Sequence, residues 1–252
     1  MFFRSLSRCL LCCAGALVVG GCSSNSASNH LESLDPTARA AADKIQADGG
    51  VVDVKLDEAG KPIVSVAFKN GHGTNADLPE VAVLPNVQSL SLESSSVDGP
   101  AWTELKKLPA LRVLNVSDSR ITDEDLGFLA ALPQLQDLKL MRTRITDKGL
   151  PALLGLKSLE RLNLAQTMID DAGVEELLPL QSLKQLQLWN TAITDQALET
   201  LAKFPNLEEL HIIKTNVSDD AAKKLLEAKP NLKIFGKLEK HPAIDREMKA
   251  EQ

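Results

Sequence analysis

The chain has 252 residues, a formal net charge of −6 and 44% hydrophobic residues, which suits one folded domain and its flanking segments. Tyrosine is absent, tryptophan occurs twice, and acidic residues outnumber basic ones. There is no basic stripe to neutralise phosphates and no aromatic platform for bases, so we expect no nucleic-acid partner.

The N-terminal residues have the layout of an export signal. Arg4 and Arg8 precede an apolar run from Leu10 to Val19, which is too short to cross about 30 Å of hydrocarbon as a helix. The sequence Val19-Gly20-Gly21-Cys22 resembles the bacterial lipobox, in which small residues precede a cysteine that is lipidated. This resemblance implies a lipoprotein signal peptide over residues 1–21 and a lipid anchor on Cys22. An ordinary cleaved signal is the alternative.

Cysteine usage also favours lipidation. Cys9, Cys12 and Cys13 lie within the predicted signal, so Cys22 is the only cysteine of the remaining chain and has no internal disulfide partner. A free thiol would be a liability in an exported protein, and acylation removes it. We therefore predict an exported, membrane-anchored lipoprotein. Ser23 follows the cysteine where an aspartate would imply retention in the inner membrane, and so favours the outer membrane.

Residues 22–33 are predicted to form a lipidated tether, because Ser23 to His30 is small and polar without periodicity. Residues 34–61 are predicted to form an N-terminal cap. A helix begins at Asp35-Pro36 and ends at Gly49-Gly50. The alternating segments that follow, residues 51–56 and 63–68, predict a β-hairpin. A separate functional domain is the alternative, but so short a segment cannot bury its own core.

Residues 62–235 are predicted to be a stack of repeats. From Ala110 to Pro205, four consecutive 24-residue blocks share apolar residues at block positions 2, 5, 7, 12, 17 and 20. Positions 5 and 7 alternate with polar neighbours as in a strand, whereas positions 17 and 20 share one helical face. Each block is therefore predicted to be a strand followed by a helix, and the strands and helices bury their apolar sides only by stacking.

The pattern L-x-x-L-x-L, followed by a T-x-I-T-D turn and a G-L-x-x-L helix, resembles leucine-rich repeats of the ribonuclease-inhibitor-like class. The resemblance implies an α/β solenoid shaped like a horseshoe, with a parallel sheet on the concave side and helices on the convex side. It also implies protein binding as the usual role. Residues 236–252 contain many charged and few apolar residues, and are predicted to be a charged C-terminal tail.

A hydroxyl or carboxylate pair precedes each predicted helix, and we expect these pairs to cap free backbone N–H groups. A ladder of calcium sites is the alternative, but one pair per repeat does not supply six converging oxygens. The pairs are Thr122-Asp123, Thr146-Asp147, Asp170-Asp171, Thr194-Asp195 and Ser218-Asp219. The hydroxyls at block position 10 are expected to bond nearby backbone groups.

Catalytic and metal-binding motifs are missing from the sequence. The four histidines, His30, His72, His211 and His241, are scattered, and no H-E-x-x-H, G-x-S-x-G or phosphate-binding glycine loop occurs. The one C-x-x-C, from Cys9 to Cys12, lies within the predicted signal. We therefore expect neither an enzyme, nor a metal site, nor a cofactor.

The concave sheet surface is the predicted binding site, because block positions 4, 6 and 8 point away from the core. At position 8, Met141, Ala165, Trp189 and Ile213 are expected to form one continuous apolar stripe of the kind found at binding hot spots. The polar residues around it include Lys139, Arg161, Gln187 and His211. The alternative is that the following loop covers position 8, so that these side chains only contribute packing.

The predicted function is a membrane-anchored, monomeric protein-binding module outside the cytoplasm, with an unidentified protein or envelope polymer as partner. The alternative is a structural cell-envelope protein that self-associates or binds the cell wall.

Overall fold

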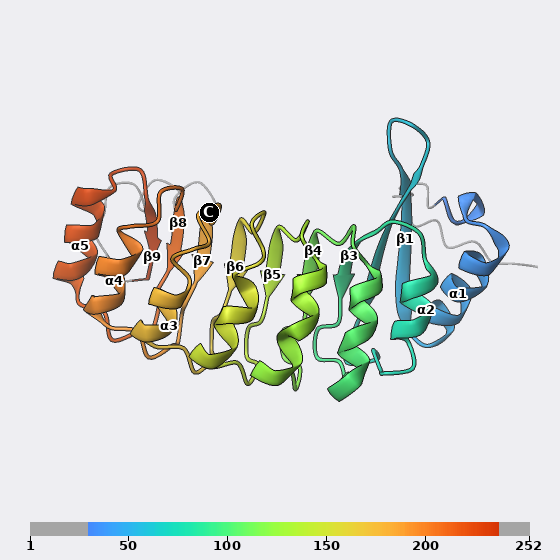
Figure 1. Cartoon of the computed structure of the whole chain (residues 1–252), viewed down its shortest axis with the longest axis horizontal. Coiled ribbons are helices and arrows are strands. Elements are labelled where there is room, and N and C mark those ends of the chain that lie inside the picture. Colours follow the sequence, from blue (N-terminus) through green and yellow to red (C-terminus); the bar gives the residue numbers. More distant parts are fainter. Residues whose placement is uncertain (1–29, 237–252) are drawn as a thin grey trace, which may run out of the picture.

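The computed structural model describes residues 30–236. Within this range the strands form one nine-stranded sheet in chain order, in which β1 and β2 are antiparallel and every later pair is parallel. The strands are β1 Gly50–Leu56, β2 Pro62–Phe68, β3 Val87–Ser91, β4 Val113–Asn115, β5 Asp137–Lys139, β6 Arg161–Asn163, β7 Gln185–Gln187, β8 Glu209–His211 and β9 Lys233–Phe235. Figure 1 shows an elongated stack with helices along one side of the sheet.

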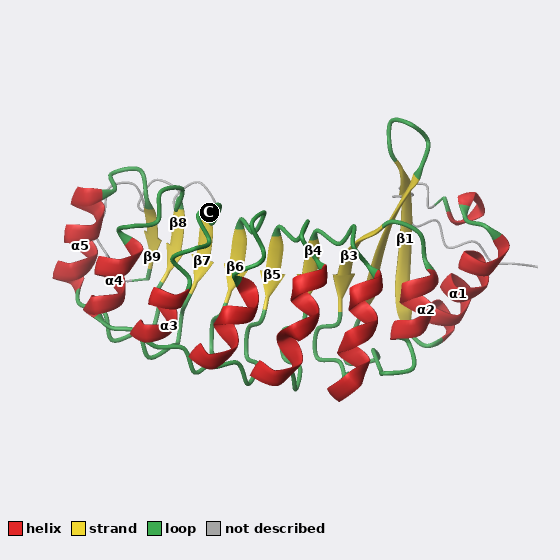
Figure 2. Cartoon of the chain, viewed as in Figure 1, coloured by secondary structure: helices red, strands yellow, loops and turns green. Residues whose placement is uncertain are grey.

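The helical segments alternate with the parallel strands (Figure 2). Those labelled η are 3₁₀ helices. The segments are η1 Leu31–Ser33, α1 Pro36–Ala47, α2 Leu78–Val83, η2 Gly99–Lys107, η3 Asp123–Ala131, η4 Asp147–Leu153, α3 Asp171–Glu176, α4 Asp195–Leu201 and α5 Asp219–Ala228. Each of these helices is too short or too polar to serve as a membrane span within residues 30–236.

The middle repeats differ from the predicted helices, because η2, η3 and η4 are 3₁₀ helices. A 3₁₀ helix rises about 2.0 Å per residue against 1.5 Å for an α-helix, so these segments are longer than α-helices of the same number of residues. In η4, Pro151 also lacks the N–H group that an α-helical bond would use.

The helix and hairpin expected before the repeats are present. The carboxylate of Asp35 accepts hydrogen bonds from the backbone N–H groups of Thr37 and Ala38, which caps α1. One side of α1 is buried through Ala38, Ala41, Ala42 and Ile45. Because β2 pairs with both β1 and β3, the hairpin joins the parallel stack directly. The assignment of residues 34–61 as a separate cap remains a prediction.

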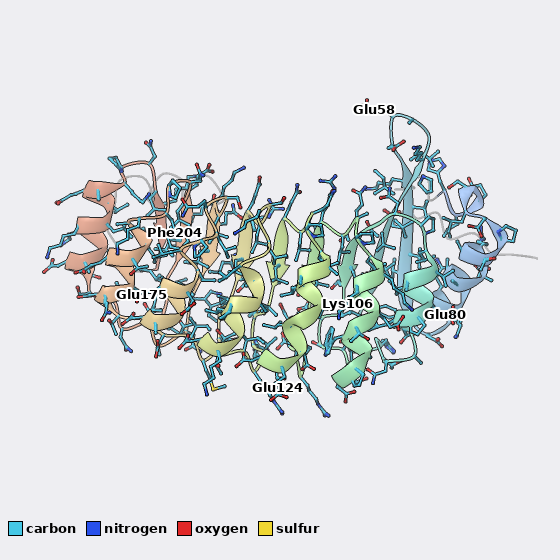
Figure 3. All side chains as sticks on the ribbon, in the orientation of Figure 1. Glu58, Glu80, Lys106, Glu124, Glu175 and Phe204 are labelled. Atoms are coloured by element: carbon cyan, nitrogen blue, oxygen red, sulfur yellow. The ribbon has the colours of Figure 1, made fainter. Side chains whose placement is uncertain are left out.

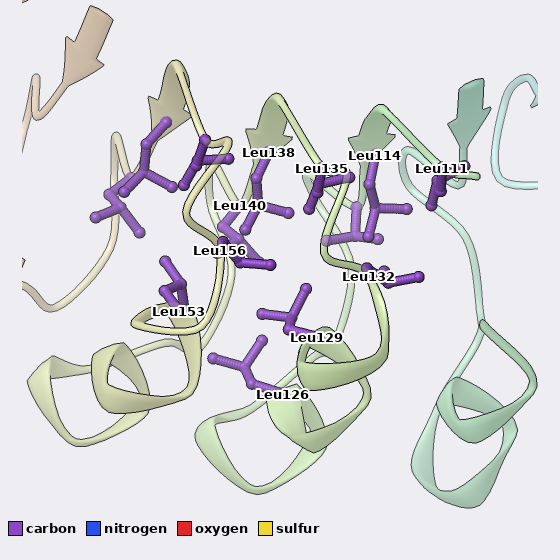
Figure 4. Close-up of a cluster of buried hydrophobic side chains, with 14 of the residues drawn as sticks. Leu111, Leu114, Leu126, Leu129, Leu132, Leu135, Leu138, Leu140, Leu153 and Leu156 are labelled. Carbon is purple, nitrogen blue, oxygen red and sulfur yellow. The ribbon is translucent and has the colours of Figure 1, made fainter. Parts of the chain in front are cut away.

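The core consists of columns of leucines, one from each repeat (Figure 4). Leu114, Leu138 and Leu162 lie opposite one another on β4, β5 and β6, and each is at most 1% exposed. Leu126 and Leu129 of η3 close the same layer from the helical side. At about 1.5–3 kcal/mol for each fully buried aliphatic side chain, these columns are the main favourable term in folding.

Hydroxyl groups at block position 10 close the bend after β4 to β8, as expected, but not after β3, where the buried Ser95 hydroxyl has no hydrogen-bond partner among the described residues. Each donates to the carbonyl three residues earlier at 2.5–2.8 Å: Ser119, Thr143, Thr167, Thr191 and Thr215. In the same part of the bend, block position 9 has φ between 54° and 58° in consecutive repeats, for example at Asp118, Arg142 and Gln166. The chain therefore turns sharply away from the sheet directly after position 8.

Candidate binding surface on the sheet

The outward rows of the sheet lie where the sequence placed them. In β5, β6 and β7 the central leucine is buried and its two neighbours are not, so positions 4 and 6 face away from the helices. This concave face carries Asp137, Lys139, Arg161, Asn163, Gln185, Gln187, Glu209 and His211. By contrast, Glu124 and Glu175 lie on the helical side (Figure 3).

The expectation of a continuous apolar stripe at position 8 is wrong. Ala165 is 0% exposed and Ser117 is 2% exposed, whereas Met141 and Trp189 are half-buried and Ile213 is 43% exposed. The same bend follows position 8 in each of these repeats, so the difference follows the length of the side chain. The Ala165 N–H group donates to Asn163 and its carbonyl accepts from Arg142, so its short side chain stays below the surface. Ala165 therefore cannot contact a partner.

An aromatic pair at the end of the sheet was missed in the sequence. The rings of His211 and Phe235 stack with a centroid distance of 4.4 Å and an interplanar angle of 16°. Leu210 pairs with Ile234 at the 24-residue offset of the earlier repeats, which places Phe235 opposite His211. Counting 24 residues from His211 would have found the pair with Phe235.

We call Trp189, His211, Ile213 and Phe235 the aromatic end of the sheet. All four lie on the last three strands or directly after them, and none is fully buried. Burial lowers the pKa of His211 below its ordinary value, and the nearby carboxylate of Glu209 partly opposes that shift. Burial therefore favours the neutral form of the imidazole, which suits its stacking on an apolar ring.

A polar hollow of about 170 Å³ lies beside the aromatic end. Arg161 donates from Nε to Oδ2 of Asp137 at 2.9 Å, and Gln185 donates from Nε2 to Oε2 of Glu209 at 2.8 Å. The residues lining the polar hollow are Asp137, Lys139, Arg161, Leu162, Asn163, Gln185 and Gln187. It therefore contains three of the predicted contact residues, Lys139, Arg161 and Gln187.

A larger groove of about 510 Å³ lies on the helical side, between α4 and α5. Its floor includes Leu198, Ala202 and Leu225, and Glu199 and Lys224 are among its polar residues. None of the residues predicted from the sequence lines it. It separates the last two helices, where short alanine side chains leave space between them.

Among residues 30–236, no three His, Cys, Asp or Glu side chains are placed to hold one metal ion. His30 lies beside Glu32, with 3.8 Å between Nδ1 and Oε1, and His72 packs against Gly49 in the N-terminal region. The predicted lipidation site, Cys22, and His241 lie outside the described residues.

Comparison with known proteins identifies the architecture. Residues 109–169 match the family model described as Leucine rich repeat. No curated protein matches the chain. Solved structures similar to the chain include two internalins from Listeria monocytogenes. Internalin C2 has a TM-score of 0.50 and 22% identity, over 82% of this chain and 95% of that one.

The second structure, internalin InlF, has a TM-score of 0.47 and 22% identity over 62% of this chain. The match covers 49% of InlF, so the chain corresponds to about half of its length. With the parallel sheet and flanking helices described above, the fold is an α/β leucine-rich-repeat solenoid. The ribonuclease-inhibitor-like class of its repeats remains a prediction.

Proposed function

We propose that the protein is an exported, membrane-anchored lipoprotein that binds another protein through the concave face of its sheet. The observation that carries this proposal is the aromatic end, where Trp189 and Ile213 expose apolar surface beside a polar hollow. Binding hot spots combine an aromatic anchor of this kind with a polar surround. The other predicted contact residues, Met141, Lys139, Arg161, Gln187 and His211, lie on the same face.

The anchor is proposed from the sequence. Cys22 follows a predicted signal, and seven residues, or eight Cα–Cα steps, separate it from His30, where the described chain begins. A chain segment of that length spans at most about 28 Å, so the tether would keep the solenoid close to the membrane. The outer membrane is favoured because Ser23 follows the cysteine.

The N-terminal peptide of protein purified from its native membrane tests the anchor. We expect a mass that corresponds to an acylated Cys22. A mass that shows an unmodified Cys22, or retention of Met1, would reject the lipoprotein assignment and leave the concave surface to be tested separately.

Capture from envelope extracts tests the binding surface. We expect Trp189→Ala to lose the captured partner while its melting temperature stays close to that of the wild type. Met168→Ala is the matched control, because Met168 is an apolar side chain that is 63% exposed and lies outside the aromatic end. Equal capture by both variants would reject the proposed surface.

We also propose that the protein acts as a monomer, without cofactor or nucleic acid. Sedimentation at increasing concentration separates this from the alternative, a structural envelope protein that self-associates. A sedimentation coefficient that rises with concentration would favour the alternative.

A further inference from the structure

The polar hollow offers more hydrogen-bond donors than acceptors. The Lys139 side chain is exposed and has no partner among residues 30–236. Arg161 uses Nε for Asp137, which leaves its terminal guanidinium nitrogens without a partner in the same range. Both cations are therefore available to an incoming group.

The two amides next to these cations add further donors. Oδ1 of Asn163 accepts the backbone N–H of Ala165 at 3.0 Å, which fixes the orientation of the amide and leaves its NH₂ group free. The Gln187 side chain has no hydrogen-bond partner among the described residues. Donors from three neighbouring strands thus line one small hollow.

The charge of the polar hollow also differs from that of the whole chain. Two cations, Lys139 and Arg161, and one carboxylate, Asp137, line it, although the chain has a net charge of −6. The carboxylate is already paired with Arg161, and the nearby Glu209 accepts from Gln185. A group that supplies acceptor oxygens and one negative charge would complement what remains.

We infer that the polar hollow binds the carboxylate of an acidic side chain in an extended segment of the partner protein. This inference rests on the proposed function of the concave face. A planar carboxylate matches the fork of Arg161 and the amide donors. A sugar hydroxyl, in contrast, would bring a donor of its own into a hollow that already has an excess of donors.

The aromatic end gives the same segment a second contact. The polar hollow is centred on β6 and the aromatic end on β8, so about 10 Å separate them at a strand spacing of about 4.8 Å. An extended peptide rises about 3.3 Å per residue. The segment would therefore carry an Asp or Glu about three positions from a large apolar residue.

The test is a titration of the ¹⁵N-labelled protein with two capped peptides, Gly-Glu-Ala-Ser-Trp-Gly and the same peptide with Gln in place of Glu. The side-chain amide signals of Asn163 and Gln187 report on the polar hollow, and the indole signal of Trp189 reports on the aromatic end. We expect the Glu peptide to bind about tenfold more tightly than the Gln peptide, since a charge-assisted hydrogen bond is lost.

Charge-removing variants show whether the preference comes from the polar hollow. Lys139→Gln and Arg161→Gln should each reduce the ratio between the two peptides several-fold. Lys203→Gln removes the same charge from an exposed site outside the hollow and should leave the ratio unchanged. A ratio that falls equally in all three variants would mean that general electrostatics, rather than the hollow, sets the preference, and would overturn the inference.

The remaining outcomes distinguish a carboxylate of the partner protein from other occupants of the polar hollow. Equal affinity for both peptides, or amide shifts produced equally by inorganic phosphate, would overturn the choice of a carboxylate while leaving the concave face as a binding surface. Amide shifts that depend on protein concentration alone would assign the hollow to a second copy. Shifts that appear when residues 237–252 are removed would assign it to the chain's own C-terminal segment. Either result would contradict the inference even if Trp189→Ala still loses its captured partner.

Discussion

The carboxylate of Asp123 accepts two hydrogen bonds from Thr146 of the next repeat. Oδ1 accepts its backbone N–H at 2.8 Å and Oδ2 accepts its hydroxyl at 2.6 Å. Equivalent pairs of hydrogen bonds join Asp171 to Thr194 and Asp195 to Ser218. From Asp123 to Asp195, the second residue of each pair therefore links successive repeats. The first residue caps its own helix at Thr146, Asp170, Thr194 and Ser218.

Asp123→Ala should lower the free energy of unfolding by about 1–2 kcal/mol, because it removes two hydrogen bonds to a partly buried carboxylate. Urea denaturation measures the change. Glu124→Ala is the control, since Glu124 is the exposed neighbour of Asp123 on the outer face. Similar losses in both variants would show that the bond between the repeats contributes nothing specific.

Asp170→Thr should raise stability at pH 7 by about 1 kcal/mol, because a hydroxyl would replace the carboxylate that now lies beside Asp147. Burial, together with the charge of Asp170, raises the pKa of Asp147 above its ordinary value. The stability tied to Asp147 is therefore present below its unfolded pKa and is lost as the pH rises through the folded value.

The gain from Asp170→Thr should shrink as the pH falls towards 4, where protonation relieves the contact between the carboxylates. Urea denaturation from pH 4 to 7 measures it. Glu176→Gln removes one exposed negative charge from the same helix and should show no comparable gain. A gain independent of pH would exclude repulsion between Asp147 and Asp170 as its cause.

Acidification should weaken the C-terminal end of the stack through His211. Its folded pKa lies below the unfolded value of 6.5 because of burial, with Glu209 opposing. The neutral ring therefore contributes stability that is fully present above pH 6.5 and declines as the pH falls through the folded pKa.

Phe235→Ala should expose the imidazole and move the pKa of His211 back towards 6.5, as measured by an NMR titration of the ring protons. His30 is the internal reference, because it lies at the other end of the solenoid. A His211 pKa that stays unchanged in Phe235→Ala would mean that the stacked ring does not cause the burial.

Trp102→Phe should change the free energy of unfolding by less than about 1 kcal/mol. Trp102 is 1% exposed and stacks on Phe128 at 6.0 Å, but its Nε1–H has no partner among the described residues. Removing an unpaired buried donor also removes its desolvation penalty, which offsets part of the free energy lost with the buried apolar area.

Trp102→Ala removes the whole ring and should cost about 3–5 kcal/mol. Thermal and urea unfolding of both variants provide the comparison. If Trp102→Phe lowers the free energy of unfolding as much as Trp102→Ala does, the indole N–H must have a hydrogen-bond partner in solution.

The 24-residue repeat and the direction of its side chains can be predicted from the sequence alone. A 24-residue period with Leu at the strand positions can bury its apolar faces only by stacking, and this fixes which residues, such as Lys139 and Gln187, face outward. Local periodicity is sufficient there, because strand alternation is a property of the backbone.

Contacts that depend on neighbouring repeats could be found only in the folded chain. The carboxylates of the Thr-Asp pairs bind across repeats, Ala165 is buried where the chain bends, and the register of β9 brings Phe235 onto His211. Each of these contacts joins residues about one repeat apart or depends on a bend with positive φ. Their geometry is set by how one repeat packs on the next, which a single repeat's pattern does not contain.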